Sequence, residues 1–557
     1  MRNRHALILS WLPEYPKEWL RFDLIAGLTT AAVVIPKTMA YATIAGLPVE
    51  VGLYTALVPM VIYAVLGTSR PLSVSTTTAI AILTANELAL AVPQGSSADL
   101  MAAATTLALL VGSILIGAAI LKLGYVANFI SDPVLTGFKA GIGVVIIVDQ
   151  LPKLLGVHFN KTGFFRDLVS LVRHIPETLV PTLVLGLVTL TLLIGLEHLM
   201  PKAPAPLIAV MLGVAASGLI GLEGAGVELV GKIPGGLPSF ALPNMSLAEK
   251  LWPAALGIAL MSFTESVAAG RAFAQSGEPR PQANRELLAL GAANVAGAFF
   301  QIMPAGGGTS QTAVNRRAGA MSQMAGLITV AAVVGTLLFL APVIRLMPQA
   351  TLAAVVVATS IPLINPSDFR KIIEVRRLEF WWALVALAGV VVLGALNGIL
   401  VAIAVSMLAL LHQANHPPVY ILGRKHGTEV YRPLSPEHPE DETFPGMLIA
   451  RTEGRIHFAN AQRVGDKLWP IVHAEKPKVI VLDSGAVPDL EFTALKMLID
   501  AERKLRESGT ELWLASLNPA ALRMVRNSPL GRVLGRGRMY ATLAEAVAAY
   551  QKQRENE

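Results

Sequence analysis

The sequence contains no cysteine, which excludes disulfide bonds, thiolate catalysis and metal sites built on cysteine. Charged residues are also scarce, at 15% of the 557 residues, where an average soluble domain has roughly 25%. Apolar residues make up 54%, and the mean hydropathy is +0.58. A soluble core in a chain of this length does not need so much apolar surface. The excess therefore predicts segments that face lipid.

Signs of catalysis, cofactors and nucleic-acid binding are missing as well. The apolar segments contain no Ser–His–Asp arrangement, no His-x-x-x-His pair and no cluster of metal ligands. No loop resembles a nucleotide-binding loop with its lysine and serine, which argues against transport driven by ATP hydrolysis. We therefore expect neither an enzyme nor a cofactor. The net charge of +7 does not indicate nucleic acid, because the basic residues flank apolar segments instead of forming one patch.

Long apolar runs dominate the first three quarters of the chain. A helix needs roughly 20 residues to cross about 30 Å of hydrocarbon. Twelve runs fit, at 22–42, 51–67, 101–121, 133–151, 177–197, 204–222, 250–271, 284–303, 322–345, 348–364, 378–395 and 397–413. Two shorter segments, 76–92 and 309–317, follow the stretches Pro71 to Ser75 and Gly306 to Gly308. Each is expected to be an extended stretch that leads into a helix starting inside the membrane.

These fourteen segments divide into two sets of seven, with the short segment third in each set. The first repeat covers about 22–222 and the second about 250–415, within a transmembrane domain at 22–415. Interrupted segments in matching positions are typical of inverted-repeat transporters and mark their substrate site. The alternative is a pair of interfacial helices or re-entrant loops without a binding role.

The placement of basic residues predicts the orientation. The N-terminal segment 1–21 has no signal-peptide pattern. If this segment lies in the cytoplasm, most basic loop residues also face the cytoplasm. These are Arg271, Arg280, Arg285, Arg316, Arg317, Arg370, Lys371, Arg376 and Arg377. The opposite loops near residues 45, 95 and 396 carry no Lys or Arg. We expect a multi-pass protein of the bacterial inner membrane with both termini cytoplasmic. The segment 152–176 breaks the rule with Lys153, Lys161, Arg166 and Arg173, and is expected to form an interfacial helix.

The C-terminal part differs in composition. Residues 416–444 are rich in His, Pro and Glu and are expected to be a linker. From 445 to 557 the pattern alternates between strands, at 447–450, 479–482 and 511–514, and helices, at 464–472, 493–507 and 543–550. Such alternation predicts a small α/β domain with helices packed on a sheet.

Several short motifs stand out along the chain. In the first half they are Ile35 to Ala42, Ala45 to Pro48, Gly52 to Thr55 and Gly67 to Arg70. In the second half they are Glu265 and Ser266, Glu286 to Gly291, Asn294, Pro304, Ala313 to Asn315, and Ala318 and Gly319. Together these motifs resemble those of the SulP anion permeases, a family of sulfate, bicarbonate and chloride transporters. With Phe458 to Asn460, Val481 to Asp483 and a degenerate Asp489 to Thr493, the soluble part resembles a STAS domain, so the resemblance covers nearly the whole chain.

The resemblance implies a mainly α membrane protein with a seven-plus-seven inverted repeat, whose core domain moves against a gate domain, and a homodimer. It places the anion between the N-termini of the third and tenth helices, facing the first and eighth. Helix N-termini supply free N–H groups and positive partial charge. The predicted donors are Ser75, Thr76, Thr77, Thr78, Thr309 and Ser310. The alternative for any single hydroxyl is a bond to a carbonyl of its own helix.

Two positions depart from the family pattern. Lys37 stands where the family usually has glutamine, and Gln311 stands where many members carry an arginine beside the substrate. We expect Lys37 to take over the electrostatic role, because a lysine at this depth must face a cavity or a partner. Tyr41 and Gln311 complete the predicted binding residues. The alternative is that Lys37 snorkels or pairs structurally.

Glu265 is the predicted coupling residue. A buried carboxyl beside an anion is suited to take up a proton when the anion binds. One possible cycle begins with a Lys37–Glu265 pair, from which the anion displaces Glu265 before it is protonated. The alternatives are a glutamate with a structural role, and a sodium site built from Glu265, Thr264 and carbonyl groups near Gly307.

The sequence therefore predicts a secondary active anion transporter in the lipid bilayer that works by alternating access, with sulfate as the first candidate and protons, or sodium, as partners. Alternatives are a sodium- or proton-coupled bicarbonate or C4-dicarboxylate transporter, an exchanger, and a chloride channel-like protein. The STAS domain is expected to bind a cytoplasmic regulator or to support assembly. Thr493 is a possible phosphate acceptor, but capping of its helix is the favoured role.

Overall fold

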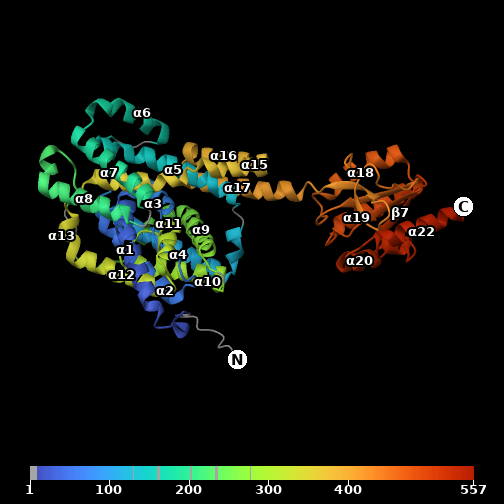
Figure 1. Cartoon of the computed structure of the whole chain (residues 1–557), viewed down its shortest axis with the longest axis horizontal. Coiled ribbons are helices and arrows are strands. Elements are labelled where there is room, and N and C mark those ends of the chain that lie inside the picture. Colours follow the sequence, from blue (N-terminus) through green and yellow to red (C-terminus); the bar gives the residue numbers. More distant parts are fainter. Residues whose placement is uncertain are drawn as a thin grey trace. The chain divides into compact units, whose positions relative to one another are not determined.

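The computed structural model describes residues 9, 11–93, 95–128, 131–159, 163–200, 203–231, 236–275 and 277–556. Lys161 of the expected interfacial segment lies outside them. The chain forms two compact units, Met1–Met407 and Leu408–Glu557, and the division falls within helix α17. Figure 1 shows the helical first unit in blue to yellow and the mixed second unit in orange and red.

The first unit consists of helices and two very short strands. Its helices are α1 (Trp19–Ile44), α2 (Val49–Leu66), α3 (Thr78–Ala91), α4 (Ser97–Ile120), α5 (Asp132–Leu155), α6 (Phe164–His174), α7 (Val180–Leu199), α8 (Ala205–Ile220), α9 (Ala248–Ala272), α10 (Ala283–Ala298), α11 (Thr309–Arg317), α12 (Met324–Gly335), α13 (Ala341–Ile344), α14 (Gln349–Ser360), α15 (Pro366–Val375), α16 (Arg377–Leu393) and α17 (Ala395–Ala414). The strands are β1 (Val74–Ser75) and β2 (Gly306–Gly307).

Eight helical stretches of the described chain are long and apolar enough to cross a membrane, and three shorter apolar helices accompany them. Every predicted apolar segment coincides with helix, whereas the number of fourteen crossings stays a prediction. The segment 322–345 is interrupted by a π-helical turn at Thr336–Leu340, just before Pro342. Proline lacks the N–H that would continue the α-helical ladder, which explains the break.

Helix α6 has the amphipathic character expected of an interfacial helix. Phe165, Leu168, Val169 and Val172 are exposed on one side of it, while Leu171 is buried. An exposed apolar stripe beside charged residues suits the boundary between headgroups and hydrocarbon. Its position in a membrane stays a prediction.

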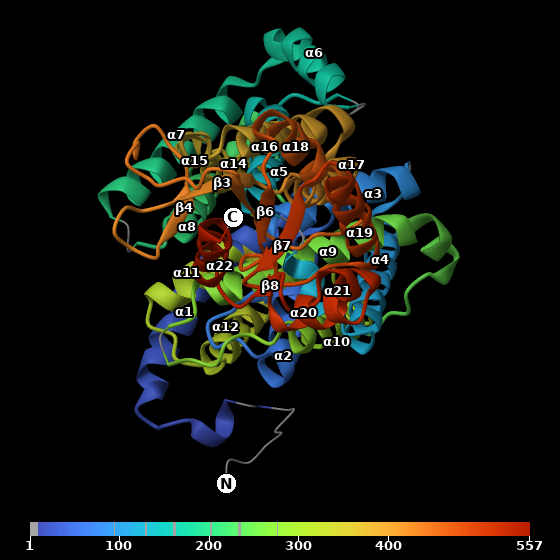
Figure 2. The ribbon, with the colours of Figure 1, turned by 90° about the vertical axis from the view of Figure 1, so that its right-hand side faces the viewer.

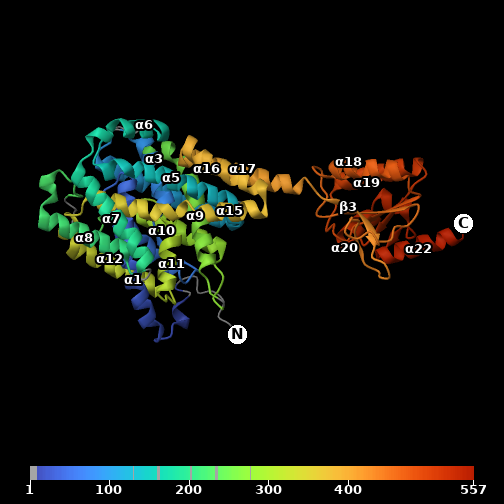
Figure 3. The same cartoon turned by 45° about the horizontal axis from the view of Figure 1, so that its top comes forward.

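Helices α5 and α16 lie side by side in close contact (Figure 3). A Cβ atom on Gly137 of α5 would overlap with the carbonyl group of Ala383 on α16, so only glycine allows this approach. By contrast, a Cβ atom on Gly117 of α4 would meet nothing within 4 Å.

Gly137→Ala is therefore expected to destabilise the first unit by about 1–3 kcal/mol, the usual cost of overpacking a tight contact. The melting temperature of the detergent-solubilised protein should fall by several degrees, whereas Gly117→Ala should leave it nearly unchanged. Equal melting temperatures for the two variants would contradict this packing.

The second unit is a six-stranded sheet covered by helices on both faces. The strand order is β4-β3-β5-β6-β7-β8. The strands are β3 (Val419–Arg424), β4 (Tyr431–Pro433), β5 (Met447–Thr452), β6 (Val479–Asp483), β7 (Glu511–Ala515) and β8 (Met539–Tyr540). The helices are α18 (Ala461–Glu475), α19 (Phe492–Glu507), α20 (Pro519–Arg526), α21 (Pro529–Leu534) and α22 (Leu543–Glu555). Helices α18 to α21 cover one face and α22 covers the other; Figure 2 shows α19 and α22 on opposite sides of β7.

Two expectations for this region need correction. The linker expected at 416–444 contains β3 and β4, and β3 pairs with β5 from Val419–Thr452 onward. The two strands are joined by a hairpin turn in which Gly427 has a φ of +70°, and the edge strand β4 ends at Pro433. Thr493 does not cap α19, because the helix begins at Phe492 and Thr493 lies exposed in its first turn.

Arginine–carboxylate pairs tie the hairpin to residues 441 and 442. Arg432 Nε and Nη2 donate to the two oxygens of Asp441, each at 2.8 Å, and Arg424 Nε donates to Glu442 at 2.8 Å. These hydrogen bonds lower the pKa of both carboxyls below their usual values. A depressed carboxyl pKa stabilises the fold above the unfolded-state pKa, and this contribution is lost as the pH falls through the folded-state pKa.

Acidification below the ordinary carboxyl pKa near 4 should therefore begin to remove this contribution, and the loss is complete only below the lowered folded-state pKa values. Arg432→Gln should lower the melting temperature of the second unit at neutral pH. It should also make the melting temperature fall less steeply as the pH is lowered. Scanning calorimetry of the full chain measures both. A variant whose pH dependence matches that of the wild type would contradict the assignment.

Candidate functional site

The two strands of the first unit join its two interrupted segments. β1 pairs with β2 in antiparallel orientation, with Val74 opposite Gly307 and Ser75 opposite Gly306. Helices α3 and α11 begin shortly after these strands. Their N-termini are therefore held at one place, and the first turn of a helix carries backbone N–H groups without partners in the helix. This is the juxtaposition that the two broken segments predict.

Strand β2 consists of glycine because it lies directly on α9. A Cβ atom on Gly306 would come within 2.7 Å of Ser262 Oγ, and one on Gly307 within 3.0 Å of Ser266 Cα. The N–H of Gly307 also donates to Ser266 Oγ at 2.6 Å. The start of α11 is thus fixed against α9.

Three of the predicted binding residues hold the two breaks together. Ser75 Oγ donates to Gln311 Oε1 at 2.9 Å, and Gln311 Nε2 donates to the Thr76 carbonyl at 3.3 Å. All three residues are buried. The Thr76 hydroxyl has no hydrogen-bond partner within the described ranges. Ser75 and Gln311 therefore bond to each other across the site, which the sequence did not reveal.

Other predicted residues present polar groups that a solute can reach. Lys37 Nζ donates to Ser310 Oγ at 3.3 Å, and Lys37 is half-buried while Ser310 is exposed. Thr78 and Thr309, at the first positions of α3 and α11, are half-buried. Tyr41 is buried. The Lys37 ammonium group thus lies at the start of α11, next to the Ser310 hydroxyl.

Glu265 lies at the same place but has a different partner from the one expected. Its carboxylate accepts a hydrogen bond from Thr77 Oγ1 at 2.8 Å, and Thr77 also caps α3 by accepting from the Ile80 N–H at 3.4 Å. The Lys37–Glu265 pair of the possible cycle does not form among the described residues: Lys37 bonds to Ser310, and the charged side chain that acts on it is Glu197 of α7. The cation that acts on Glu265 is Lys139 of α5.

The sodium alternative depends on oxygen ligands. The buried hydroxyl of Thr264 has no hydrogen-bond partner in the part of the chain that the structure covers. Within the same part, no group of three or more His, Asp or Glu side chains could hold a metal ion. A sodium ion here would be held by Glu265, hydroxyls and carbonyl oxygens, such as that of Gly307.

Both parts of the chain match models of known protein families. A model described as the sulfate permease family matches residues 20–386, and a STAS domain model matches residues 438–546. The chain belongs to the sulfate permease family. It is a multi-pass, mainly α membrane protein that ends in an α/β STAS domain, as the sequence predicts.

Relatives of this permease extend over almost the whole chain. A probable sulfate transporter of Mycobacterium tuberculosis is 35% identical over 554 residues, which cover 98% of both chains. The probable sulfate transporter 3.4 of Arabidopsis thaliana is 31% identical over 97% of this chain and 86% of its own. Murine Solute Carrier 26 family member A9, an anion transporter, shares the fold with a TM-score of 0.88 at 22% identity, over 99% and 96% of the chains. The transmembrane domain of a cyanobacterium bicarbonate transporter gives 0.64 at 23% identity, over 72% of this chain and all of its own.

One residue that fixes the position of α11 was not identified from the sequence. Arg316 near the end of α11 donates to the Phe273 carbonyl at 2.8 Å and to the Ala320 carbonyl at 2.9 Å, and it pairs with Glu278. Phe273 directly follows α9. Both ends of α11 are therefore tied to α9 or its following loop. Arg316 looked like an ordinary cytoplasmic basic residue in the sequence.

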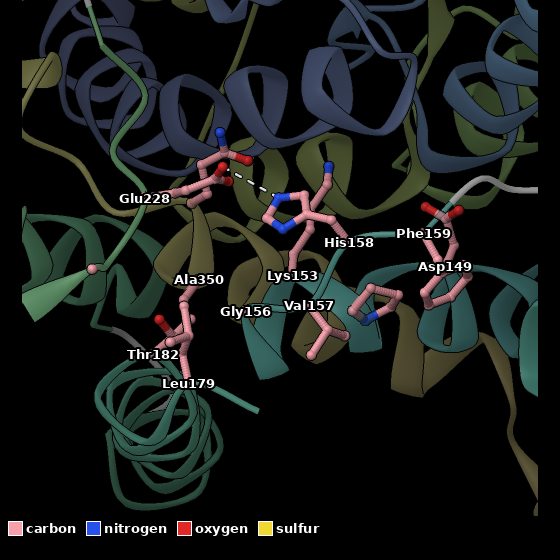
Figure 4. Close-up of a pocket in the computed structure, with 13 residues that line it drawn as sticks. Asp149, Lys153, Gly156, Val157, His158, Phe159, Leu179, Thr182, Glu228 and Ala350 are labelled. Atoms are coloured by element: carbon pink, nitrogen blue, oxygen red, sulfur yellow. Dashed lines mark ion pairs between the residues drawn. The ribbon is translucent and has the colours of Figure 1, made fainter. Parts of the chain in front are cut away.

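A separate pocket lies where α5 ends and α7 and α14 begin (Figure 4). Its volume is about 370 Å³, and none of the predicted site residues lines it. Lys153 and His158 line it together with Asp149 and Glu228, and His158 Nε2 lies 3.2 Å from Glu228 Oε1. Because charges of both signs meet here, the pocket has no evident preference for anions.

Proposed function

We propose that this permease moves a small inorganic anion, sulfate, across the membrane by secondary active transport. One observation carries the proposal: paired strands hold the N-termini of α3 and α11 together beside the accessible ammonium of Lys37. An anion that leaves water must replace its hydration shell with other donors. Backbone N–H groups, hydroxyls and one cation at a single place offer that replacement.

Sulfate is supported by the names of relatives that match nearly the full chain. The candidate contacts are Lys37, Thr78, Thr309 and Ser310, because these residues are accessible at the site. Tyr41, Thr76 and Thr77 are buried and would contact the anion through a local rearrangement, or support the accessible groups. Ser75 and Gln311 would keep the two helix starts in register through their mutual bond.

Proton coupling through Glu265 is the second part of the proposal. In the structure the Thr77 hydroxyl donates its hydrogen bond to the Glu265 carboxylate. Once Glu265 binds a proton, its O–H can donate to Thr77 instead, and the Thr77 hydroxyl hydrogen becomes available to the anion. Protonation would thereby improve the anion site, and a bound anion would favour protonation, as binding linkage requires.

The proposal also covers the transport cycle and the location of the protein. The anion would be exposed to each side in turn as a core domain containing α1, α3, α9 and α11 moves against a gate domain containing α5 and α14. We place the protein in a bacterial inner membrane as a homodimeric symporter, with both termini in the cytoplasm. The STAS domain would then meet cytoplasmic regulators.

Uptake into proteoliposomes tests this function. The purified protein should accumulate labelled sulfate, and an inward proton gradient should increase the accumulation. Labelled bicarbonate, nitrate, chloride and a C4-dicarboxylate form the comparison panel. If the protein takes up none of these anions, the proposal is overturned. If it prefers another anion of the panel, that anion replaces sulfate as the proposed cargo. Sodium-driven uptake without a response to the proton gradient would overturn the assignment of the coupling ion.

A further inference from the structure

Two phenylalanine rings lie exposed on the surface of the second unit. Phe458 is 71% exposed and Phe492 is 78% exposed, more than any other large apolar side chain in the described part of this unit. The two residues belong to neighbouring loops, because the Phe458 N–H donates to Glu491 Oε2 at 3.4 Å and Glu491 directly precedes Phe492. Exposed apolar side chains that gather at one place mark an interaction surface.

The topology of the sheet places both loops at one edge. Strands β5, β6 and β7 are parallel, so the loops that follow β5 and β6, with Phe458 and Phe492, leave from the same edge. The chain also enters the sheet at this edge, because Val419 at the start of β3 pairs with Thr452 at the end of β5. The segment that leads from α17 into the sheet therefore shares this edge with the two rings.

The end of α17 is bonded to the loop of Phe458. Asn460 is buried, and its side-chain N–H groups donate to the Ala414 carbonyl at 2.9 Å and to the Arg455 carbonyl at 3.0 Å. Lys467 of α18 donates to the Pro417 carbonyl, just after the helix, at 2.9 Å. The loop is thus fixed to the last residue of α17.

Helix α17 indicates where the membrane boundary lies. Its C-terminal part is apolar, and Leu408, Leu410 and Leu411 are exposed on it. In a membrane protein such leucines face lipid. Ala414 is three residues beyond Leu411, or about 4.5 Å along the helix at 1.5 Å per residue. The bond between Ala414 and the loop therefore lies close to the level of the lipid headgroups.

We propose that Phe458 and Phe492 insert into the lipid surface on the side of the membrane where α17 ends, and so dock this edge of the STAS domain on the membrane. Phe458 is only two positions before Asn460, which holds the end of α17. Apolar rings at such a boundary enter the zone between headgroups and acyl chains while the loop backbone stays hydrated. The inference concerns the STAS domain and does not depend on which anion the permease carries.

The contact is apolar in nature. The carboxylates next to the rings, Asp489 and Glu491, lie 3.2 and 3.5 Å from Arg455 Nη2 and are paired with it. The rings therefore approach lipid without an unpaired charge from these two acids. Salt screens the attraction between charged groups, whereas it does not weaken the burial of apolar surface. Docking is therefore expected in neutral lipid and at high salt.

Fluorescence quenching of the full chain in phosphatidylcholine nanodiscs tests the contact. The chain has no native cysteine, so Gln462→Cys, in the first turn of α18 after the Phe458 loop, accepts a single fluorophore. Phosphatidylcholine brominated near the start of its acyl chains should quench this fluorophore, at low and at high salt. Val430→Cys is the matched control, because Val430 bonds to Lys425 beyond the end of β3, at the opposite edge of the sheet. A fluorophore there should not be quenched.

Replacement of the rings shows whether they hold this edge on lipid. Phe458→Ser combined with Phe492→Ser should abolish the quenching at position 462. Val430→Ser combined with Val533→Ser removes two exposed apolar side chains elsewhere in the domain and should leave it intact. Because both rings are exposed, their replacement should not change the melting temperature of the second unit, so unfolding would not explain the loss.

Three results would overturn the proposal. One is equal quenching at position 462 with and without the rings. Another is loss of the quenching at high salt, which would show that charged groups make the attachment. The third is a fluorophore at position 462 that emits as in an apolar environment but is not quenched by brominated lipid. Protein, from a second copy of the chain or from the first unit, would then cover the rings in place of lipid.

Discussion

Lys37→Gln is expected to raise the half-saturation concentration for the transported anion by about tenfold to a hundredfold. The ammonium of Lys37 lies at the start of α11 and is accessible beside Ser310. A hydrogen bond to a charged group contributes about 1.5–3 kcal/mol, which corresponds to that range of affinity. Initial rates of uptake at increasing anion concentration measure the effect.

Matched variants define what the Lys37 result means. Ser310→Ala should weaken binding by only a few fold, because it removes one neutral hydroxyl while the charge remains. His158→Gln should leave the half-saturation concentration unchanged, since the site residues do not line its pocket. If Lys37→Gln transports with wild-type affinity and rate, Lys37 does not belong to the anion site.

Glu265→Gln is expected to abolish the response of transport to a proton gradient. The amide cannot take up a proton, so the switch in hydrogen bonding with Thr77 cannot occur. Downhill exchange of labelled for unlabelled anion should continue, because the helix N-termini and Lys37 remain in place. Accumulation under an inward proton gradient, compared with exchange at equal pH, separates the two activities.

The matched control for this variant is Glu228→Gln, which neutralises a carboxylate in the separate pocket. It should retain wild-type accumulation under a proton gradient. If Glu265→Gln still accumulates the anion when a proton gradient is applied, proton coupling runs through another group. Loss of both exchange and accumulation in a stably folded variant would instead indicate a structural role for Glu265.

The sequence predicts the local features of the site well, because they are encoded in neighbouring residues. Gly306 to Gly308 and the threonines after Ser75 mark breaks in apolar runs, and each break becomes a strand that leads into a short helix. The helices themselves follow from apolar runs that are long enough to span lipid. The STAS strands β5, β6 and β7 follow from their apolar strand patterns, whereas β3 and β4 lie in the region expected to be a linker.

Partners between distant segments could not be predicted in this way. A Lys37–Glu265 pair was one possible start of the transport cycle, yet the fold brings Ser310 to Lys37 and Thr77 to Glu265. Burial alone does not say which groups meet. Lys139 carried the same signal as Lys37, an ionisable residue within an apolar run, and could have been found by applying that rule throughout.

The most direct test of the account uses the absence of native cysteine. Ser310→Cys places a single thiol at the exposed start of α11, and His158→Cys places one in the separate pocket. The rate of modification by a methanethiosulfonate reagent is then measured as sulfate is increased. We predict that sulfate slows modification at 310, over the concentration range that saturates transport, and leaves modification at 158 unchanged. If sulfate saturates transport but does not protect the thiol at 310, the anion does not bind between the two helix N-termini.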